Sequence, residues 1–134
     1  MKTSLELQVR YKETDKMGRV YHSNYFVWLD MARTEFLREA GVSYKEMEDE
    51  GVYFVVVETN CKYKNSLGFD DKVLINTWIK EVKKASVEFE YQVLNKDTKQ
   101  LIAEAYTKLA AVNTQGKVIP IPQKILKSLN ISNA

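Results

Sequence analysis

The first apolar residues of the chain alternate with polar ones. Leu5, Leu7, Val9 and Tyr11 share one parity in the stretch "LELQVRY". A period of two residues is typical of a β-strand with one buried face. We therefore expect a half-buried strand over residues 5–11, with Tyr11 on its inward face.

The pattern then changes to one that favours a helix. Residues 25–40 contain neither glycine nor proline, and their first half is apolar on nearly every side. Such a segment is expected to be a mostly buried helix. Ser23 or Asn24 is the expected N-cap, and Gly41 lies where a left-handed C-cap residue is common. The wetter face of this helix is predicted to carry Asp30, Arg33, Thr34 and Arg38.

The rest of the chain has the pattern of strands joined by short loops. Residues 43–50 predict one or two helical turns, and residues 122–130 predict a short terminal helix that begins at Pro122. Strands are predicted over residues 52–64, 72–82, 86–94 and 101–113. In the third of these strands, the residues predicted to face inward are Val87, Phe89, Tyr91 and Val93.

This order of elements predicts a single α+β domain over residues 1–134. Short connections favour antiparallel neighbours, so the strands should form one antiparallel sheet. A single helix can cover only one face of that sheet, and small residues leave room for it. These small residues are Ala103, Ala105 and Ala111. The opposite face would carry Trp78, Tyr106 and Val112 beside polar residues, which favours contact with another subunit.

The composition excludes several classes of protein. The 20 basic and 18 acidic residues give a net charge of +2, too balanced to indicate a nucleic-acid-binding surface. No run approaches the roughly 20 apolar residues of a membrane span, and the N-terminus is charged where a signal peptide is apolar. The single cysteine, Cys61, cannot form an internal disulfide, which fits a cytoplasmic protein. No His/Cys cluster predicts a metal site, and no cofactor is expected.

The candidate chemistry lies just before the predicted long helix. Asp15 precedes the only histidine, His22, by seven residues, and Gly18 lies between them. The start of a helix offers unpaired N–H groups and a partial positive charge, and a glycine permits a left-handed turn toward it. A carboxylate at such a point suits acyl transfer, which requires a stabilised oxyanion and a nucleophile or activated water. The alternatives are an Asx-turn for Asp15 and a structural role for His22.

A family resemblance covers roughly residues 5–122. It rests on "VRYKETDKMGRVYHSNYFVWLDMARTEFLREAG", which contains the spacing Y-x-x-T-D-x-x-G-x-V-x-H-x-N-Y, and on the later "GFDD" and "KVLINTWI". The chain resembles the hot-dog-fold acyl-CoA thioesterases, above all the 4-hydroxybenzoyl-CoA thioesterase family with its YbgC-type branch. The resemblance implies a sheet of about five strands around one long helix. It also implies a homodimer with a continuous sheet, often a homotetramer, with active sites at the subunit interface.

The resemblance also implies roles for individual residues. Asp15 matches the catalytic carboxylate, which could attack the thioester or activate water, and Tyr11 and His22 match residues beside it. The peptide N–H of His22 matches the group that polarises the thioester carbonyl. Basic residues would bind the nucleotide end of coenzyme A. In the stretch "EVKKAS" the candidates are Lys83, Lys84 and Ser86.

Other interpretations of the same residues stay open. Tyr11 has inward parity, so a core role suits it equally, and the lysine pair could be only a solvated turn, with Lys62 and Lys64 the next candidates. Cys61 is interpreted as a core residue, because no histidine stands near it in sequence. An acyl-carrier-protein thioesterase and a non-catalytic acyl-CoA-binding protein are the competing functions. A hot-dog dehydratase is disfavoured, because its histidine has a different local context.

Overall fold

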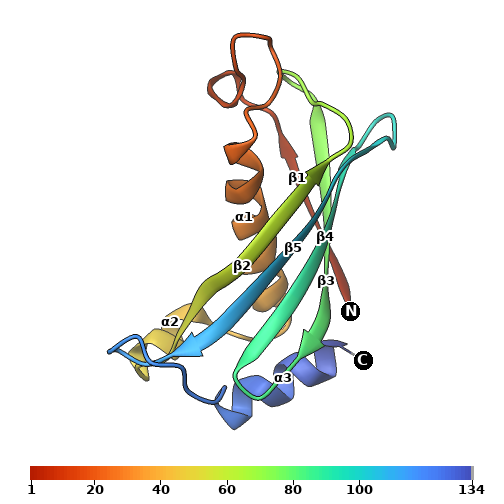
Figure 1. Cartoon of the computed structure of the whole chain (residues 1–134). Helices are drawn as coiled ribbons and strands as arrows, with labels where there is room; N and C mark the ends of the chain where they lie inside the picture. Colours follow the sequence, from red (N-terminus) through yellow and green to blue (C-terminus); the bar gives the residue numbers. More distant parts are fainter. Residues whose placement is uncertain (134) are drawn as a thin grey trace.

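The computed structural model of the protein describes residues 1–133 (Figure 1). Its strands are β1 (Lys2–Gln8), β2 (Tyr53–Tyr63), β3 (Lys72–Val82), β4 (Ser86–Asn95) and β5 (Leu101–Val112). Its helices are η1 (Tyr11–Glu13, a 3-10 turn), α1 (Ser23–Glu39), α2 (Tyr44–Asp49) and α3 (Gln123–Asn133). The strands form one sheet in the order β1-β3-β4-β5-β2, and every pairing is antiparallel. The sheet curves around α1, which confirms the predicted α+β hot-dog fold.

The core lies between α1 and the concave face of the sheet. Phe36 of α1 meets Phe89 of β4 edge to face, with ring centroids 5.4 Å apart. All four residues of β4 that were predicted to face inward are buried, as are the small residues Ala103 and Ala111 of β5. Small side chains on β5 leave room for aromatic rings from α1 and β4, so the helix can approach the sheet closely.

The end of α1 confirms the expected role of Gly41. Its φ is +83°, its N–H donates to the carbonyl of Arg38 (3.1 Å), and the N–H of Val42 donates to the carbonyl of Leu37 (2.8 Å). This pair of bonds is a Schellman motif, which requires a left-handed residue that glycine adopts without strain.

The start of α1 differs from expectation. The helix begins at Ser23, and its N-cap is His22, which makes no side-chain capping bond. The predicted cap at Ser23 or Asn24 is therefore wrong. The amide of Asn24 donates instead to the carbonyl oxygen of Glu13 (2.9 Å), so it fastens the preceding loop to the helix.

The first strand ends earlier than predicted, at Gln8, and the predicted inward position of Tyr11 is wrong. Tyr11 lies in η1, is 76% exposed and packs edge to face against Phe69. The chain turns here because the carboxylate of Glu13 accepts a hydrogen bond from the N–H of Arg10 (2.8 Å). That turn breaks the alternation on which the prediction depended.

One residue of the predicted wet face of α1 is buried. Asp30 and Arg38 are exposed as expected, but Arg33 is only 6% exposed. Its guanidinium donates to the hydroxyl of Tyr91 on β4 (3.3 Å) and to the carboxylate of Asp30. A polar partner inside the core allows the long side chain to turn inward.

The convex face of the sheet carries paired aromatic and charged side chains. The ammonium of Lys2 lies 5.0 Å from the ring centroid of Trp78, whose indole N–H donates to Glu90 (3.2 Å). At one edge of the sheet, β2 exposes three consecutive valines, Val55–Val57, and no other strand of the described residues pairs with its outer side. Among residues 1–133, no helix is both long and apolar enough for a membrane crossing.

Candidate active site

The loop between β1 and α1 holds Asp15 in a tight turn. One carboxylate oxygen of Asp15, Oδ1, accepts hydrogen bonds from the N–H groups of Met17 (2.8 Å) and Arg19 (3.2 Å). Gly18 has a φ of +78°, as its predicted turn requires. Asp15 therefore does form the Asx-turn of the alternative interpretation, but the turn uses only one of its two carboxylate oxygens. Oδ2 accepts no hydrogen bond from any other described residue, so it is free to act on a ligand.

Asp15 and His22 line one shallow hollow of about 490 Å³. The loop, the first turn of α1 and the end of β2 all contribute to its wall. The remaining lining residues are Arg19, Val20, Tyr21, Tyr25, Tyr63, Lys64, Asn65 and Ser66. The structure therefore brings together two of the three predicted catalytic residues. Tyr11 is not among the residues that line the hollow.

The backbone at the start of α1 offers the groups that the hydrolysis of a thioester requires. In the described part of the chain, the N–H of His22 donates to no protein acceptor. The seventeen-residue helix that follows adds a partial positive charge at this end. The ring of His22 stacks on Tyr21, with centroids 4.3 Å apart, and among residues 1–133 no hydrogen bond holds its ring nitrogens. The backbone of His22 is therefore better placed for a defined role than its ring.

Two tyrosines close the inner side of the hollow. Tyr25 and Tyr63 meet edge to face at 5.1 Å, and the hydroxyl of Tyr63 donates to the carbonyl of His22 (3.2 Å). Burial, together with the neighbouring Cys61, raises the pKa of Tyr63 to about 12, so this hydroxyl is a donor at neutral pH. Burial also raises the pKa of the Cys61 thiol, which fits a core residue and not a nucleophile.

A buried carboxylate that the sequence did not reveal supports the loop. Glu13 is 4% exposed, and its Oε2 accepts a hydrogen bond from the indole N–H of Trp28 (2.8 Å). Burial raises the pKa of Glu13, but hydrogen bonds from Arg10 and Trp28 outweigh this and hold it below its usual value. A glutamate in a polar loop is normally predicted to be exposed to solvent. The loss of alternation after Val9 is the only sequence feature that could have indicated the burial of Glu13.

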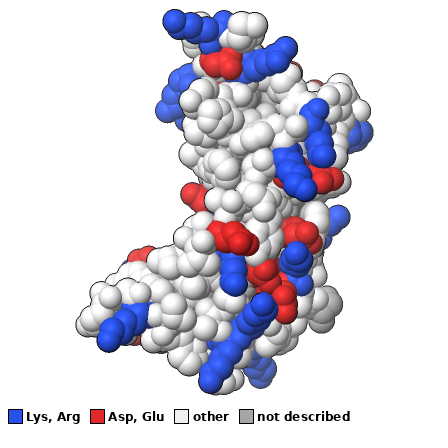
Figure 2. All heavy atoms as spheres, viewed as in Figure 1, with Lys and Arg blue, Asp and Glu red and all other residues white. Residues whose placement is uncertain are grey.

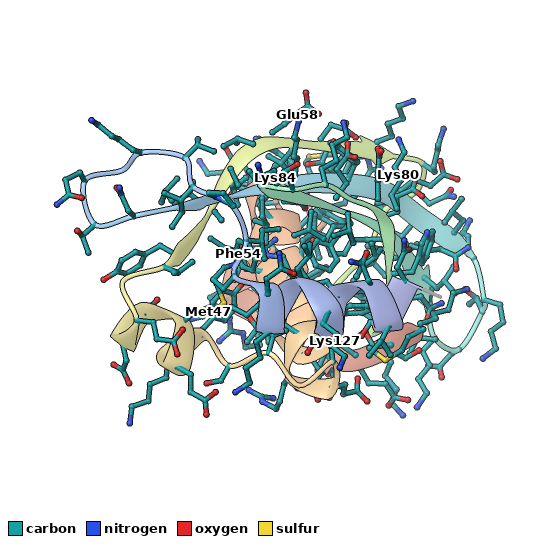
Figure 3. The ribbon with its side chains drawn as sticks, turned by 90° about the horizontal axis from the view of Figure 1, so that it is seen from below. Met47, Phe54, Glu58, Lys80, Lys84 and Lys127 are labelled. Atoms are coloured by element: carbon teal, nitrogen blue, oxygen red, sulfur yellow. The ribbon has the colours of Figure 1, made fainter. Side chains whose placement is uncertain are left out.

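The three residues predicted to bind coenzyme A lie away from the hollow that contains Asp15. Lys83 and Lys84 lie in the turn between β3 and β4, and Ser86 begins β4. The carbonyl of Lys84, which is labelled in Figure 3, accepts a hydrogen bond from the N–H of Ile121 (2.8 Å). Tyr63 of β2 and Val93 of β4 both pair with Ala103 of β5, so they lie at the same level of the sheet. The turn lies on the far side of Val87, toward the start of β4. Six residues along β4, at about 3.3 Å each, amount to roughly 20 Å. Within one chain these residues do not join the hollow.

Basic side chains do lie close to Asp15. Arg19 and Lys64 line the hollow itself, and Figure 2 shows further Lys and Arg side chains at the same end of the molecule. A positive rim of this kind would attract an anionic ligand, although exposed charges are screened by salt.

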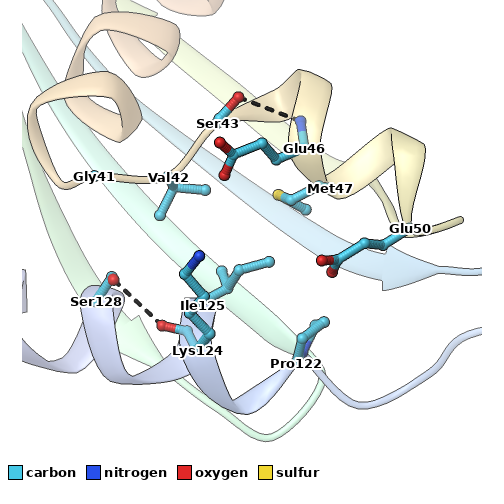
Figure 4. Close-up of a pocket in the computed structure, with 10 residues that line it drawn as sticks. All are labelled: Gly41, Val42, Ser43, Glu46, Met47, Glu50, Pro122, Lys124, Ile125 and Ser128. Atoms are coloured by element: carbon cyan, nitrogen blue, oxygen red, sulfur yellow. Dashed lines mark hydrogen bonds between the residues drawn. The ribbon is translucent and has the colours of Figure 1, made fainter.

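Neither a metal centre nor the hollow between α2 and α3 offers a second acyl site. Residues 1–133 contain no group of three His, Cys, Asp or Glu side chains that could hold a metal ion. A second hollow, between α2 and α3, is lined by Ser43, Glu46, Met47 and Lys124 among others, but has a volume of only about 40 Å³ (Figure 4). That volume suits a few water molecules and no acyl group.

The chain is similar to known proteins over most of its length. A family model described as the thioesterase-like superfamily matches residues 9–129. The putative acyl-CoA thioesterase YneP of Bacillus subtilis is 39% identical over 90 residues, which cover 67% of this chain and 65% of YneP. The acyl-CoA thioesterase YbgC of Haemophilus influenzae is 31% identical over 119 residues, covering 88% of this chain and 85% of YbgC. The crystal structure of hypothetical protein TT1821 from Thermus thermophilus has a TM-score of 0.92 and 33% identity, covering 100% of this chain and 99% of that one.

Proposed function

The chain belongs to the thioesterase-like superfamily, and from this premise we propose that it is an acyl-CoA thioesterase. It would hydrolyse the thioester to a carboxylic acid and free coenzyme A. The observation that carries the proposal is the meeting, in one hollow, of a carboxylate with a free oxygen and a helix start with a free N–H. The names of the relatives YneP and YbgC support the same activity.

The proposed mechanism uses these two groups in turn. The thioester carbonyl oxygen accepts a hydrogen bond from the N–H of His22, where the positive end of α1 stabilises the developing oxyanion. Asp15 either takes a proton from a water that attacks the carbonyl carbon, or attacks that carbon itself to give an anhydride that water then opens. The C–S bond breaks in both routes. Because a thiol has a pKa of about 8.5, the leaving thiolate requires no strong acid.

We propose that the working enzyme is a homodimer or homotetramer, built by pairing the β2 edges of two copies. Antiparallel pairing would place the Tyr63 end of one β2 beside the Tyr53 end of the other. The Tyr53 end of β2 lies at the same end of the sheet as the turn between β3 and β4. Lys83, Lys84 and Ser86 of a second copy would then stand near the hollow of the first, two strand spacings or about 10 Å from the edge. This arrangement supports the proposed contact of these residues with coenzyme A.

Three further assignments stay predictions. Tyr11 could act as a site residue only if a ligand or a second copy extends the hollow toward it. An acyl-carrier protein remains an alternative carrier, because a basic rim suits either. A cytoplasmic location remains an expectation from the sequence.

The test is a hydrolysis assay with purified protein. Release of free thiol would be followed for short, long and aromatic acyl-CoA esters and for the corresponding acyl-carrier-protein esters. Turnover of acyl-CoA that disappears in the Asp15→Asn variant supports the proposal. Binding of acyl-CoA with no thiol release would favour the non-catalytic alternative.

A further inference from the structure

Glu13 is a buried carboxylate that the proposed reaction does not use. It lies two residues before Asp15 but does not line the hollow, so it cannot touch the substrate. Glu13 is 4% exposed, and its carboxylate is bonded to the indole of Trp28 on α1, which is 1% exposed. A buried charge is costly unless hydrogen bonds compensate for it, so a glutamate at this point calls for an explanation.

The carboxylate of Glu13 joins the segment that follows β1 to α1. Oε1 accepts from the N–H of Arg10 (2.8 Å), while Oε2 accepts from the indole N–H of Trp28 (2.8 Å) and from the guanidinium of Arg10 (3.3 Å). The backbone carbonyl of the same residue accepts from the N–H of Tyr21 (2.8 Å) and from the amide of Asn24 (2.9 Å). Residue 13 is thus fixed to the strand end before it, to the loop end after it and to α1.

This anchor bears directly on the placement of Asp15. The turn that carries Asp15 runs outward from the bridge between Thr14 and Val20. Thr14 directly follows Glu13, and Val20 directly precedes Tyr21, whose N–H donates to the Glu13 carbonyl. Asp15 is exposed and has few contacts outside its own turn. The distance from its free oxygen to the start of α1 therefore depends on the anchor below it. A misplacement of about 1 Å can lower a rate by up to 100-fold.

We propose that Glu13 is a positioning residue, which holds the turn of Asp15 at the start of α1 through its bonds to Arg10 and Trp28. This inference rests on the proposed function of Asp15. Glutamine cannot replace Glu13 here, because both sides of the carboxylate face N–H donors. An amide offers an acceptor to one side only and turns its own N–H₂ toward the other donor.

The first experiment compares Glu13→Gln with Trp28→Phe, which removes the indole donor from the other side. Each variant should lower kcat for acyl-CoA about 10-fold while KM changes less than about twofold, because binding contacts are intact. Glu48→Gln, which neutralises an exposed glutamate on α2, is the matched control and should not change kcat. Melting temperatures measured in parallel report the folded state of each protein. If Glu13→Gln does not fold, Trp28→Phe carries the test alone.

The second experiment places Glu13→Gln in the Asp15→Asn background. If Glu13 acts only through Asp15, the double variant should be no slower than Asp15→Asn alone. Wild-type kcat with a lowered melting temperature in Glu13→Gln and Trp28→Phe would overturn the inference and leave the role of Asp15 intact. Wild-type kcat in Asp15→Asn itself would instead refute the role of Asp15, and the inference would fall with it.

Discussion

The hydroxyl of Tyr63, the last residue of β2, donates a hydrogen bond to the carbonyl oxygen of His22, 3.2 Å away. It ties the edge strand to the N-cap of α1 over 41 residues of sequence. Tyr63→Phe keeps the ring contact with Tyr25 and removes the hydroxyl that makes this bond. We expect the free energy of unfolding to fall by about 0.5–1 kcal/mol, as for one partly exposed hydrogen bond.

Urea unfolding measures this loss, and kcat should fall about two- to fivefold in the same variant. Tyr53→Phe is the matched control, since Tyr53 begins the same strand and its hydroxyl makes no hydrogen bond within residues 1–133. Equal unfolding free energies for both variants and the wild type would contradict the tie between β2 and α1.

Asp15→Asn should lower kcat by about 100-fold or more, because a general base or nucleophile contributes at least that much. The side-chain oxygen of asparagine can still accept from Met17 and Arg19, so the turn and the melting temperature should be preserved. Asp97→Asn, in an exposed turn, is the control. Near-normal turnover in Asp15→Asn would show that Asp15 is not catalytic.

The exposed edge of β2 predicts self-association. Val57 is 55% exposed on a strand with no outer neighbour, and an apolar edge of this kind favours strand pairing. Light scattering should show a mass of at least twice 15.6 kDa at micromolar concentration. Val57→Lys should shift the protein toward the monomer and lower activity with it. A wild-type protein that is monomeric at that concentration would contradict the proposed assembly.

Replacing both Lys83 and Lys84 with alanine should raise KM for acyl-CoA and leave kcat nearly unchanged. A lysine near the surface acts on phosphate as a point charge, and salt screens it over about 8 Å at physiological ionic strength. The increase in KM should therefore shrink as salt is added. An acyl-N-acetylcysteamine ester, which lacks the nucleotide, should be hydrolysed alike by parent and variant. Lys127→Ala on α3 serves as the control, and an unchanged KM at low salt would assign the phosphates to Arg19 and Lys64 instead.

The lowered pKa of Glu13 predicts acid sensitivity. A carboxyl group whose pKa is lower in the folded than in the unfolded state stabilises the fold above its unfolded pKa of about 4.3. That stabilisation is lost as the pH falls below this value and through the lower folded pKa. The melting temperature of Glu13→Gln should therefore fall less than that of the wild type between pH 6 and pH 3. This range extends about 1.5 pH units on either side of the unfolded pKa. Parallel curves for the two proteins would show that the pKa of Glu13 is not lower in the folded than in the unfolded state.

Local pattern was enough to predict most of the fold. The strand predicted over residues 72–82 has the same bounds as β3, and Gly41 ends α1 as expected, because both depend on neighbours in sequence. The meeting of Asp15 and His22 in one hollow likewise agrees with their spacing, since one short loop connects them. The errors at Tyr11, Asn24 and Arg33 have a shared cause. Each residue bonds or turns through a partner that the local pattern does not contain, such as Trp28 for the turn at Glu13 or Tyr91 for Arg33.

The buried contact between Arg33 and Tyr91 has a consequence for the direction in which α1 presents its first peptide. A helix is a stiff rod that turns by about 100° per residue, so His22 and Arg33, about three turns apart, point to nearly the same side. Fixing the guanidinium of Arg33 on β4 therefore sets the rotation of the whole rod about its axis. The contact of Arg33 near the middle of α1 thus sets the direction of the His22 N–H at the N-terminal end of the helix.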